Sequence, residues 1–206
     1  MFITFEGTEG SGKSLQQRLL VERLRAQGLR VLATHEPGGT PLGSELRQLL
    51  LARDELEPAP RSEALLMNAS RAQLVEKVIR PALERGEVVV CDRFGDSTLA
   101  YQGAGRGLDI QQVASVISFA TAGLLPDMTM LLDLPVEVGL ARKRVQDQRN
   151  RFEAETVAFH RRVREAYRSM AESEPGRWRC VDAVQPADQL ADEIWQAVAA
   201  RMRLHR

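Results

Sequence analysis

The chain has 206 residues, 44% hydrophobic and 27% charged, and its 28 basic and 28 acidic side chains give a formal net charge of zero. This length and composition indicate one globular domain over residues 1–206, which buries its core without disulfides or metals. Balanced charge excludes a long-range attraction to nucleic acid or to an anionic membrane, so we expect neither as a partner. Anion binding must come from local groups of charge.

The two cysteines, Cys91 and Cys180, are too few for a disulfide framework or a cysteine metal site. Each lies in an apolar stretch typical of a strand, so we expect reduced, buried thiols. The first residues show no basic segment followed by a cleavage site, and the apolar stretches end well short of a membrane span. These features predict a soluble, cytoplasmic protein.

Short apolar stretches alternate with longer amphipathic segments, which is the pattern of βαβ units on a parallel sheet. The first half of the chain is predicted to contain strands over 2–6 and 30–34 and helices from the Gly-rich turn to Gly28, over 42–51 and over 61–85. Pro81 should bend or split the last of these helices, because proline lacks a backbone N–H.

The second half begins with a predicted strand over 88–92, β-branched and uninterrupted, as a fully buried strand requires. After it we expect helical segments over 95–122, a strand over 128–133, a helix from 136, a helix over 153–173, a strand over 178–182 and a helix over 186–202. Five strands with helices on both faces form a three-layer α/β/α sheet. Ligands bind such sheets at the carboxyl ends of the strands, where Glu6, Asp92, Asp133 and Asp182 stand.

The turn after the first strand matches the phosphate-loop pattern G-x-x-x-x-G-K-[ST]. Its residues are Gly7, Thr8, Glu9, Gly10, Ser11, Gly12, Lys13 and Ser14. Glycines let backbone N–H groups converge on phosphate oxygens, and the following helix points its positive end at the anion. We expect Lys13 to reach the β- and γ-phosphates of ATP and the Ser14 hydroxyl to bind Mg²⁺. The pattern therefore predicts a P-loop NTPase fold with ATP and Mg²⁺ as cofactors.

The phosphate loop identifies a user of nucleoside triphosphates but does not identify the reaction. A GTPase would need an Asn-Lys-x-Asp segment, and neither Asn68 nor Asn150 precedes a lysine. Motor and transport ATPases usually need larger chains with coupling domains. A chain of this length favours a small phosphotransferase.

Two further segments suit phosphoryl transfer. Asp92 and Arg93 end the third strand, where a carboxylate can hold Mg²⁺ and a guanidinium can bind phosphate; a strand-end ion pair is the alternative. Residues 142–151 contain five basic residues and one acidic residue. That composition suits a small helical lid over about 142–153 that closes over the phosphates, and a solvated turn is the alternative.

Four motifs in order along almost the whole chain resemble the bacterial thymidylate kinase family of P-loop nucleoside monophosphate kinases. They are residues 5–14, the Glu-Pro-Gly-Gly-Thr loop at 36–40, the segment 92–103 and residues 150–153. The resemblance implies transfer of the γ-phosphoryl group of ATP to dTMP, giving dTDP and ADP. It also implies a homodimer.

The resemblance assigns roles to matching residues. The expected catalytic residues are Lys13, Glu9, Arg93, Arg149 and Arg151, of which the last two are lid arginines. Glu9 would contact the 3′-hydroxyl of the acceptor sugar, and Arg93 would clamp the acceptor phosphate.

The remaining roles concern nucleotide binding. Arg142 would lie by the adenine of ATP, and Arg71 would join Arg93 in clamping the acceptor phosphate. Tyr101 would pack under the sugar and disfavour a ribose 2′-hydroxyl. The other residues expected at the acceptor are Glu36, Pro37, Arg47, Met67, Ser97, Thr98 and Gln102, with Ser97, Thr98 and Gln102 nearest the base.

Three positions depart from the family pattern. Met67 stands where an aromatic residue commonly stacks on thymine, an interaction that contributes about 1–3 kcal/mol. This leaves another nucleoside monophosphate open as the acceptor. His35 and Asn150 replace a usual arginine and aspartate. A non-catalytic nucleotide-binding module is disfavoured, because it would be expected to lack Lys13, Asp92 or the lid arginines.

We predict that Arg151→Ala lowers kcat by roughly 10²–10³, the scale for removing one preorganised stabiliser of a transition state. The reason is that Glu9 makes the phosphate loop acidic where other kinases carry a basic residue, so the lid must supply the positive charge. Steady-state kinetics with saturating ATP measures the effect, and unchanged turnover would contradict the lid assignment.

Overall fold

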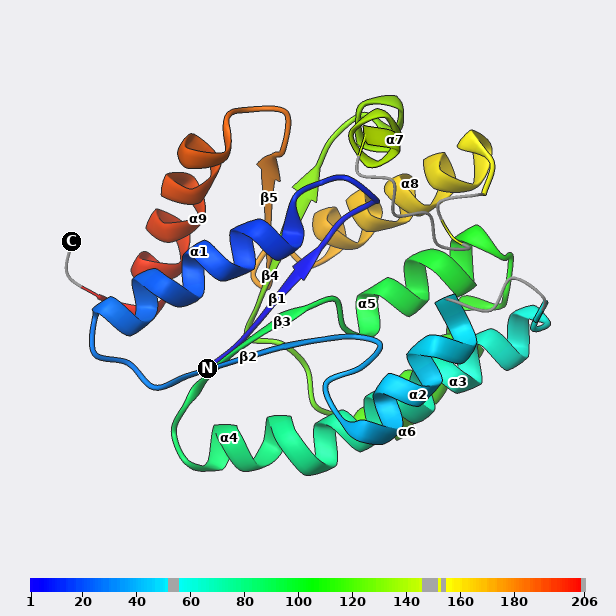
Figure 1. Ribbon diagram of the computed structural model, residues 1–206, viewed down its shortest axis with the longest axis horizontal. Helices are drawn as coiled ribbons and strands as arrows, with labels where there is room; N and C mark the ends of the chain where they lie inside the picture. The colour runs from blue at the N-terminus through cyan, green and yellow to red at the C-terminus, as the bar shows by residue number, and fades with distance from the viewer. Residues whose placement is uncertain (52–55, 146–151, 153–154, 205–206) are drawn as a thin grey trace.

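The computed structural model describes residues 1–51, 56–145, 152 and 155–204 (Figure 1). Its centre is a five-stranded parallel sheet with the strand order β2-β3-β1-β4-β5. The strands are β1 (Phe2–Glu6), β2 (Val31–His35), β3 (Val88–Asp92), β4 (Met128–Asp133) and β5 (Trp178–Asp182). The predicted α/β fold with five parallel strands is confirmed.

The inner strands are buried on both faces, as parallel strands between two helical layers must be. All five residues of β1 are buried, and β3 is buried from Val88 to Cys91. The register aligns the carboxyl ends of the strands, because Asp92 of β3 lies opposite both Phe5 and His35. The acidic strand ends therefore share one edge of the sheet.

Helices connect the strands. The α-helices are α1 (Lys13–Ala26), α2 (Pro41–Leu51), α3 (Pro60–Leu74), α4 (Arg80–Glu84), α5 (Gly95–Thr98), α6 (Ile110–Thr121), α7 (Val136–Val145), α8 (Val157–Ser173) and α9 (Ala187–Met202). Two π-helical segments, η1 (Val75–Ile79) and η2 (Leu99–Gly105), complete the order.

Separate hydrophobic clusters cover the two faces of the sheet. On one face, α1 and α9 lie side by side (Figure 1), and Leu24 and Ile194 pack with Phe5 of β1. The other face carries η1 and α4 over one part of the sheet and η2 and α8 over the rest. This arrangement is the predicted three-layer architecture, and it leaves the carboxyl ends of the strands clear of the helical layers.

The long helix predicted over 61–85 stays continuous, and a π-turn interrupts its α-helical hydrogen bonding just before Pro81. It consists of α3, the π-turn η1 and α4, with Pro81 in the first turn of α4. Proline has no N–H to donate, and the wider π-turn directly before it accommodates the lost hydrogen bond. The second π-segment, η2, carries Tyr101 and Gln102, which are adjacent in sequence and both buried.

Three predictions need correction. The helix expected from 153 begins at Val157, because the Thr156 side chain caps it by accepting a hydrogen bond from the Phe159 N–H at 3.2 Å. The second strand covers 31–35 instead of 30–34. Cys180 was expected to be buried, and it is exposed because β5 is the outermost strand of the sheet. Cys91 is buried, and both thiols are free.

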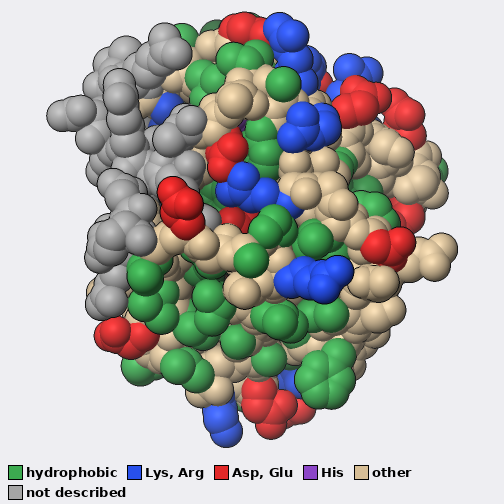
Figure 2. Space-filling model, turned by 90° about the vertical axis from the view of Figure 1, so that its right-hand side faces the viewer, with side chains coloured by type: hydrophobic (Ala, Val, Ile, Leu, Met, Phe, Trp, Pro, Cys, Tyr) green, Lys and Arg blue, Asp and Glu red, His purple; other side chains and the backbone are tan. Residues whose placement is uncertain are grey.

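Several large apolar side chains remain exposed around α3 and α6. Phe119 is 89% exposed, and Leu65, Ile110 and Leu125 are also exposed. Figure 2 shows hydrophobic side chains gathered over the lower half of the face on this side of the molecule. Among the described residues, no helix has the length and apolar character needed to cross a bilayer.

Candidate active site

A cleft of about 1060 Å³ lies at the carboxyl ends of the strands. The phosphate loop, the loop after β2, α3, the segment after β3 and the β5–α9 connection form its walls. The predicted site residues that line it are Glu9, Gly10, Ser11, Gly12, Lys13, Ser14, Glu36, Pro37, Arg47, Met67, Arg71, Asp92, Arg93, Ser97, Thr98, Tyr101, Gln102 and Arg142.

The phosphate loop packs directly against the backbone of α7. Gly10 has φ +71°, and a Cβ at this position would lie 2.1 Å from the Gly139 carbonyl oxygen. A Cβ on Gly139 would in turn lie 2.2 Å from the Glu9 carbonyl oxygen. Both glycines are therefore required by the close approach of two backbones. Gly7 and Thr8 are not among the residues that line the cleft, but their carbonyl oxygens accept hydrogen bonds from Lys13, which does line it.

The Lys13 ammonium group is buried inside its own loop. Nζ donates to the carbonyl oxygens of Gly7 at 3.0 Å and Thr8 at 2.8 Å and to Ser11 Oγ at 3.1 Å. Burial, reinforced by the charge of Arg93, lowers the pKa of Lys13 to about 8. An anionic phosphate in the loop would favour the charged form and oppose this shift.

Ser14 and Asp92 form the part of the cleft suited to a divalent cation. The Ser14 hydroxyl donates to Asp92 Oδ2 at 2.5 Å, joining the start of α1 to the end of β3. A hydroxyl and a carboxylate this close are two hard oxygen ligands, the type that Mg²⁺ prefers. Mg²⁺ usually takes its other ligands from water and from nucleotide phosphates, so two protein oxygens fit this ion.

Arg93 lies in the part of the cleft formed by α3 and the segment after β3, which we call the acceptor side because the sequence predicts the acceptor there. Its backbone has φ 69°, which is uncommon for a residue with a side chain. Nη1 donates to Ser97 Oγ at 3.1 Å and Tyr167 OH at 3.2 Å, while Nη2 donates to Glu9 Oε1 at 3.3 Å and Tyr101 OH at 3.1 Å. The side chain is 20% exposed. Arg93 is thus oriented by four oxygens and still presents a charge to the cleft.

Glu9 places a charged carboxylate beside these cations. Its Oε1 accepts from Tyr101 OH at 2.7 Å, and its Oε2 lies 3.2 Å from His160 Nδ1. Burial alone would raise the pKa of Glu9, but His160 and the charges of Arg93 and Lys13 outweigh burial and lower it to about 2. Glu9 is therefore ionised at neutral pH and can accept a hydrogen bond from a hydroxyl.

A second carboxyl group, Glu6, is buried behind Arg93. Oε1 accepts from the Phe94 N–H at 2.8 Å, and Oε2 accepts from Ser97 Oγ at 2.6 Å and Tyr167 OH at 2.8 Å. Burial and the nearby charge of Asp96 raise the pKa of Glu6 to about 7, although Arg93 and the two hydroxyls oppose the shift. Glu6 and Glu9 therefore differ in ionisation although both border Arg93.

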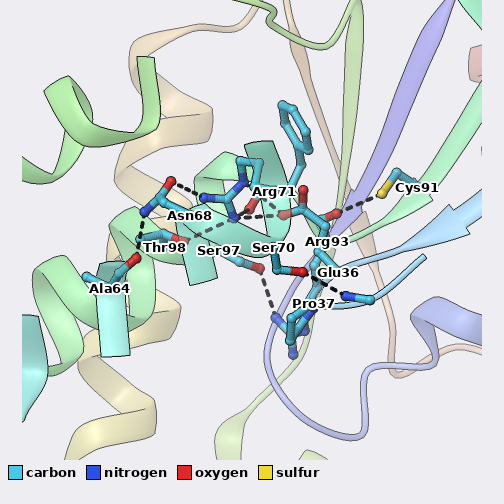
Figure 3. A network of polar contacts seen from close by, with 12 residues as sticks. Glu36, Pro37, Ala64, Asn68, Ser70, Arg71, Cys91, Arg93, Ser97 and Thr98 are labelled. Carbon is cyan, nitrogen blue, oxygen red and sulfur yellow. Dashed lines mark hydrogen bonds and ion pairs between the residues drawn. The ribbon is translucent and has the colours of Figure 1, made fainter. Parts of the chain in front are cut away.

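Arg71 ties three elements together (Figure 3). It donates from Nε to Glu36 Oε2 at 2.9 Å, from Nη1 to Asn68 Oδ1 at 2.7 Å, and from Nη2 to the Phe94 carbonyl oxygen at 3.0 Å and Thr98 Oγ1 at 3.1 Å. Its side chain is 2% exposed. To bind an acceptor phosphate, Arg71 would have to exchange one of these oxygens for a phosphate oxygen.

Burial also affects the partner of Arg71. It raises the pKa of Glu36 to about 6, against the opposing charge of Arg71. On the same loop, the carbonyl oxygen of Pro37 accepts from Arg47 Nη1 at 3.0 Å, and the Gly38 N–H donates to Ser70 Oγ at 3.1 Å. The loop after β2 is therefore attached to both α2 and α3.

The far end of the acceptor side is largely apolar. Met67 is partly buried and packs against the hydrophobic cluster that contains Tyr101 and Phe152. The rings of Tyr101 and Phe152 meet edge-on at a centroid distance of 5.6 Å. Gln102 Nε2 donates to Glu63 Oε1 at 2.7 Å. A flat ring inserted here would meet a thioether, two aromatic rings and one primary amide, which suits a nucleobase.

Arg142 joins the other end of the cleft to the β5–α9 connection. Its Nη1 donates to the Ala183 carbonyl oxygen at 2.9 Å and to the Gly10 carbonyl oxygen at 3.4 Å. Residues 183–187 line the cleft next to it. This end lies beside the phosphate loop and opposite the Met67 end, so the cleft has room for two ligands that meet near Lys13 and Arg93.

Comparisons with known proteins agree with this geometry. The family model described as thymidylate kinase matches residues 5–194. The chain belongs to the thymidylate kinase family. It is 53% identical over 206 residues to the thymidylate kinase of Thermomicrobium roseum, covering 100% of this chain and 97% of that one. It is 50% identical over 201 residues to that of Deinococcus radiodurans, covering 98% and 97%.

A solved structure supports the same family. The crystal structure of thymidylate kinase from Ehrlichia chaffeensis superposes with a TM-score of 0.78 at 31% identity, covering 96% of this chain and 98% of that chain. The resemblance drawn from four sequence motifs is therefore confirmed, together with the fold. The roles of individual residues stay predictions. Arg149 and Arg151 lie outside the described residues.

Sequence reasoning missed Tyr167, which holds Arg93, and His160, which lies against Glu9. It named Glu6 and Phe152 but gave them no role, whereas Glu6 is connected to Arg93 through the Tyr167 hydroxyl and Phe152 packs on Tyr101. Phe159, Val163 and Tyr167 repeat at helical spacing, which indicates a buried stripe. Nothing in that spacing reveals that a hydroxyl of α8 contacts the end of β1, 161 residues away in the chain.

We predict that Glu6→Gln changes how stability depends on pH. The raised pKa of Glu6 means that the folded state keeps a proton that the unfolded chain releases above about pH 4.5. The free energy of unfolding should therefore fall as pH rises from 4.5 through about 7, as ionisation of the buried carboxyl is forced. The glutamine variant cannot ionise and should fall less.

Urea denaturation across this pH window measures the difference. Glu22→Gln, which alters an exposed glutamate of α1, is the matched control and should follow the wild type. Parallel curves for Glu6→Gln and wild type would show that the carboxyl does not titrate in this window.

Proposed function

We propose that this protein catalyses transfer of the γ-phosphoryl group of ATP to dTMP, giving dTDP and ADP, with Mg²⁺ as the metal cofactor. The observation that carries the proposal is one cleft with a phosphate loop at one end, an apolar nucleobase-sized end at the other, and Lys13, Glu9 and Arg93 between them. Membership of the thymidylate kinase family supports dTMP as the acceptor.

On the donor side, the loop amides from Gly7 to Ser14 and the Lys13 ammonium would hold the ATP phosphates. Lys13 would exchange the loop carbonyls for phosphate oxygens. Ser14 and Asp92 would hold Mg²⁺, which neutralises charge on the β- and γ-phosphates. Arg142, which donates a hydrogen bond to the carbonyl oxygen of Ala183, would cover the end of the cleft that takes the adenine of ATP.

On the acceptor side, Arg93 would bind the dTMP phosphate while Glu9 accepts a hydrogen bond from the sugar 3′-hydroxyl. The Tyr101 hydroxyl donates to Glu9 and accepts from Arg93, and these hydrogen bonds hold the ring that would pack under the sugar. Thr98 and Gln102 border the base together with Met67. Phosphoryl transfer needs mainly positioning and charge neutralisation, which this arrangement supplies.

We predict that dTMP gives the highest kcat/KM among dTMP, dUMP, dCMP, dGMP, AMP and thymidine. The apolar contact of Met67 and the buried amide of Gln102 favour a thymine ring, and Arg93 favours a phosphorylated acceptor over a free nucleoside. ADP release with ATP and Mg²⁺ measures each acceptor, with a reaction lacking Mg²⁺ as control. A different best acceptor would leave the kinase assignment standing and overturn dTMP as the substrate.

We infer that the protein is a homodimer that uses the exposed apolar face of α3 and α6. Phe119 of α6, 89% exposed, and the exposed Leu65 of α3 are apolar side chains that a second copy would cover. The predicted mass in solution is twice that of the 23.0 kDa chain. Phe119→Glu should halve it, because a charge would be buried at the contact.

Light scattering after size-exclusion chromatography measures both masses. Val157→Glu, which changes an exposed apolar residue of α8, should keep the dimer. A wild-type chain that is monomeric at micromolar concentration would overturn the inference.

A further inference from the structure

Two hydroxyl groups connect Arg93 to Glu6. Arg93 Nη1 lies 3.1 Å from Ser97 Oγ and 3.2 Å from Tyr167 OH. Each of these hydroxyl oxygens also lies within hydrogen-bond distance of Glu6 Oε2, at 2.6 Å for Ser97 and 2.8 Å for Tyr167. The hydroxyls themselves are 2.8 Å apart. Arg93 Nη1 and Glu6 Oε2 therefore contact the same two hydroxyl oxygens.

The direction of these bonds follows from the chemistry of the donors. A guanidinium can only donate, so both hydroxyl oxygens accept from Arg93. Their own protons are then available to Glu6 Oε2, directly or through the other hydroxyl. An ionised carboxylate only accepts, so with Glu6 ionised the bonds run from Arg93 through the hydroxyls to Glu6.

The same carboxylate holds the backbone next to Arg93. Glu6 Oε1 accepts from the Phe94 N–H at 2.8 Å. Arg93 has φ 69°, a strained conformation for a residue with a Cβ, and such a conformation persists only where surrounding contacts fix it. Glu6 therefore restrains Arg93 from two directions, through the following peptide and through the side chain.

We propose that Glu6 and Tyr167 are positioning residues that fix the Arg93 guanidinium for the acceptor phosphate. The inference rests on the proposed function for the role of Arg93, and it adds two residues that do not line the cleft. Glu6 and Tyr167 are each 0% exposed. They act on the reaction only through Arg93.

A purely structural role for Tyr167 is the competing explanation. Its ring packs between Tyr101, at a centroid distance of 6.3 Å, and Trp178, at 6.4 Å. Phenylalanine keeps this packing and removes only the hydroxyl. Tyr167→Phe therefore removes the hydrogen bonds of the hydroxyl and keeps the packing of the ring. Glu6→Gln replaces one of two acceptor oxygens by an NH2 donor, so the side chain can no longer accept from both the Phe94 N–H and the hydroxyls.

Kinetics provides the first test. Tyr167→Phe should lower kcat/KM for dTMP roughly 10- to 100-fold, the scale of a misplaced catalytic group, and leave the KM for ATP unchanged. Glu6→Gln should act in the same direction. The control is Thr4→Val, which removes another fully buried hydroxyl, one that contacts Thr129 Oγ1 at 3.0 Å within the sheet, and it should keep wild-type values. Wild-type kcat/KM in Tyr167→Phe would overturn the proposal.

A second test does not depend on the acceptor or on activity. In the ligand-free protein, nitrogen-detected NMR should show the Arg93 guanidinium with slow rotation and separate Nη signals, assigned with Arg93→Lys. Tyr167→Phe should speed the rotation and merge these signals, whereas Thr4→Val should not. Unchanged Arg93 signals would overturn the proposal even if dTMP phosphorylation is confirmed.

The two tests also separate failure of this proposal from failure of the proposed function. If the wild type does not phosphorylate dTMP, the NMR comparison still reports whether Tyr167 holds Arg93. If Tyr167→Phe fails to fold, as shown by its thermal transition, Ser97→Ala removes the other hydroxyl and is read by the same Arg93 signals. Fast rotation of the Arg93 guanidinium in Ser97→Ala supports the proposal that the hydroxyls between Arg93 and Glu6 fix Arg93, and unchanged rotation contradicts it.

Discussion

Mutual neutralisation of buried charge is the constraint on which this site depends. Glu6, Glu9, Lys13 and Arg93 share the space at the carboxyl ends of β1 and β3, and each group affects the ionisation of its neighbours. A single charge placed there without a partner would carry a large desolvation cost. Because the cations and carboxylates alternate, the protein keeps them charged or partly charged in a region that largely excludes water. A phosphate entering the cleft meets groups that are already oriented.

Backbone geometry makes this grouping possible. The parallel register brings the ends of β1, β2 and β3 level, and the phosphate loop follows β1 without an intervening residue. Gly10 and Gly139 allow the loop and α7 to touch, so the first turns of α7 support the loop from behind. The π-segment η2 adds Tyr101 and Gln102 to the acceptor side. Each of these features is local, and the sheet aligns them.

Much of the fold could be predicted because strong local signals were available. Val88 to Val90 are β-branched and uninterrupted, and Pro81 marked the place of the π-turn in the long helix. Where local signals were weaker, the predicted boundaries were wrong. The start of α8 is an example, because the Thr156 side chain caps the helix and hydrophobic periodicity does not reveal a cap. The burial of Cys180 was also misjudged, since position at the edge of the sheet depends on strand order, which a local pattern does not specify.

The sequence by itself determined the phosphate loop, the order of the strands and helices along the chain, and the family, because these depend on residues close together in sequence. Only the tertiary structure decided which distant groups meet. Tyr167 reaches Glu6 across 161 residues, and Tyr101 reaches Glu9 across 92. Such contacts depend on how helices pack on a sheet, and packing is set by the shape and volume of the whole core. A buried tyrosine that fills the core and one that also orients an arginine look the same in sequence.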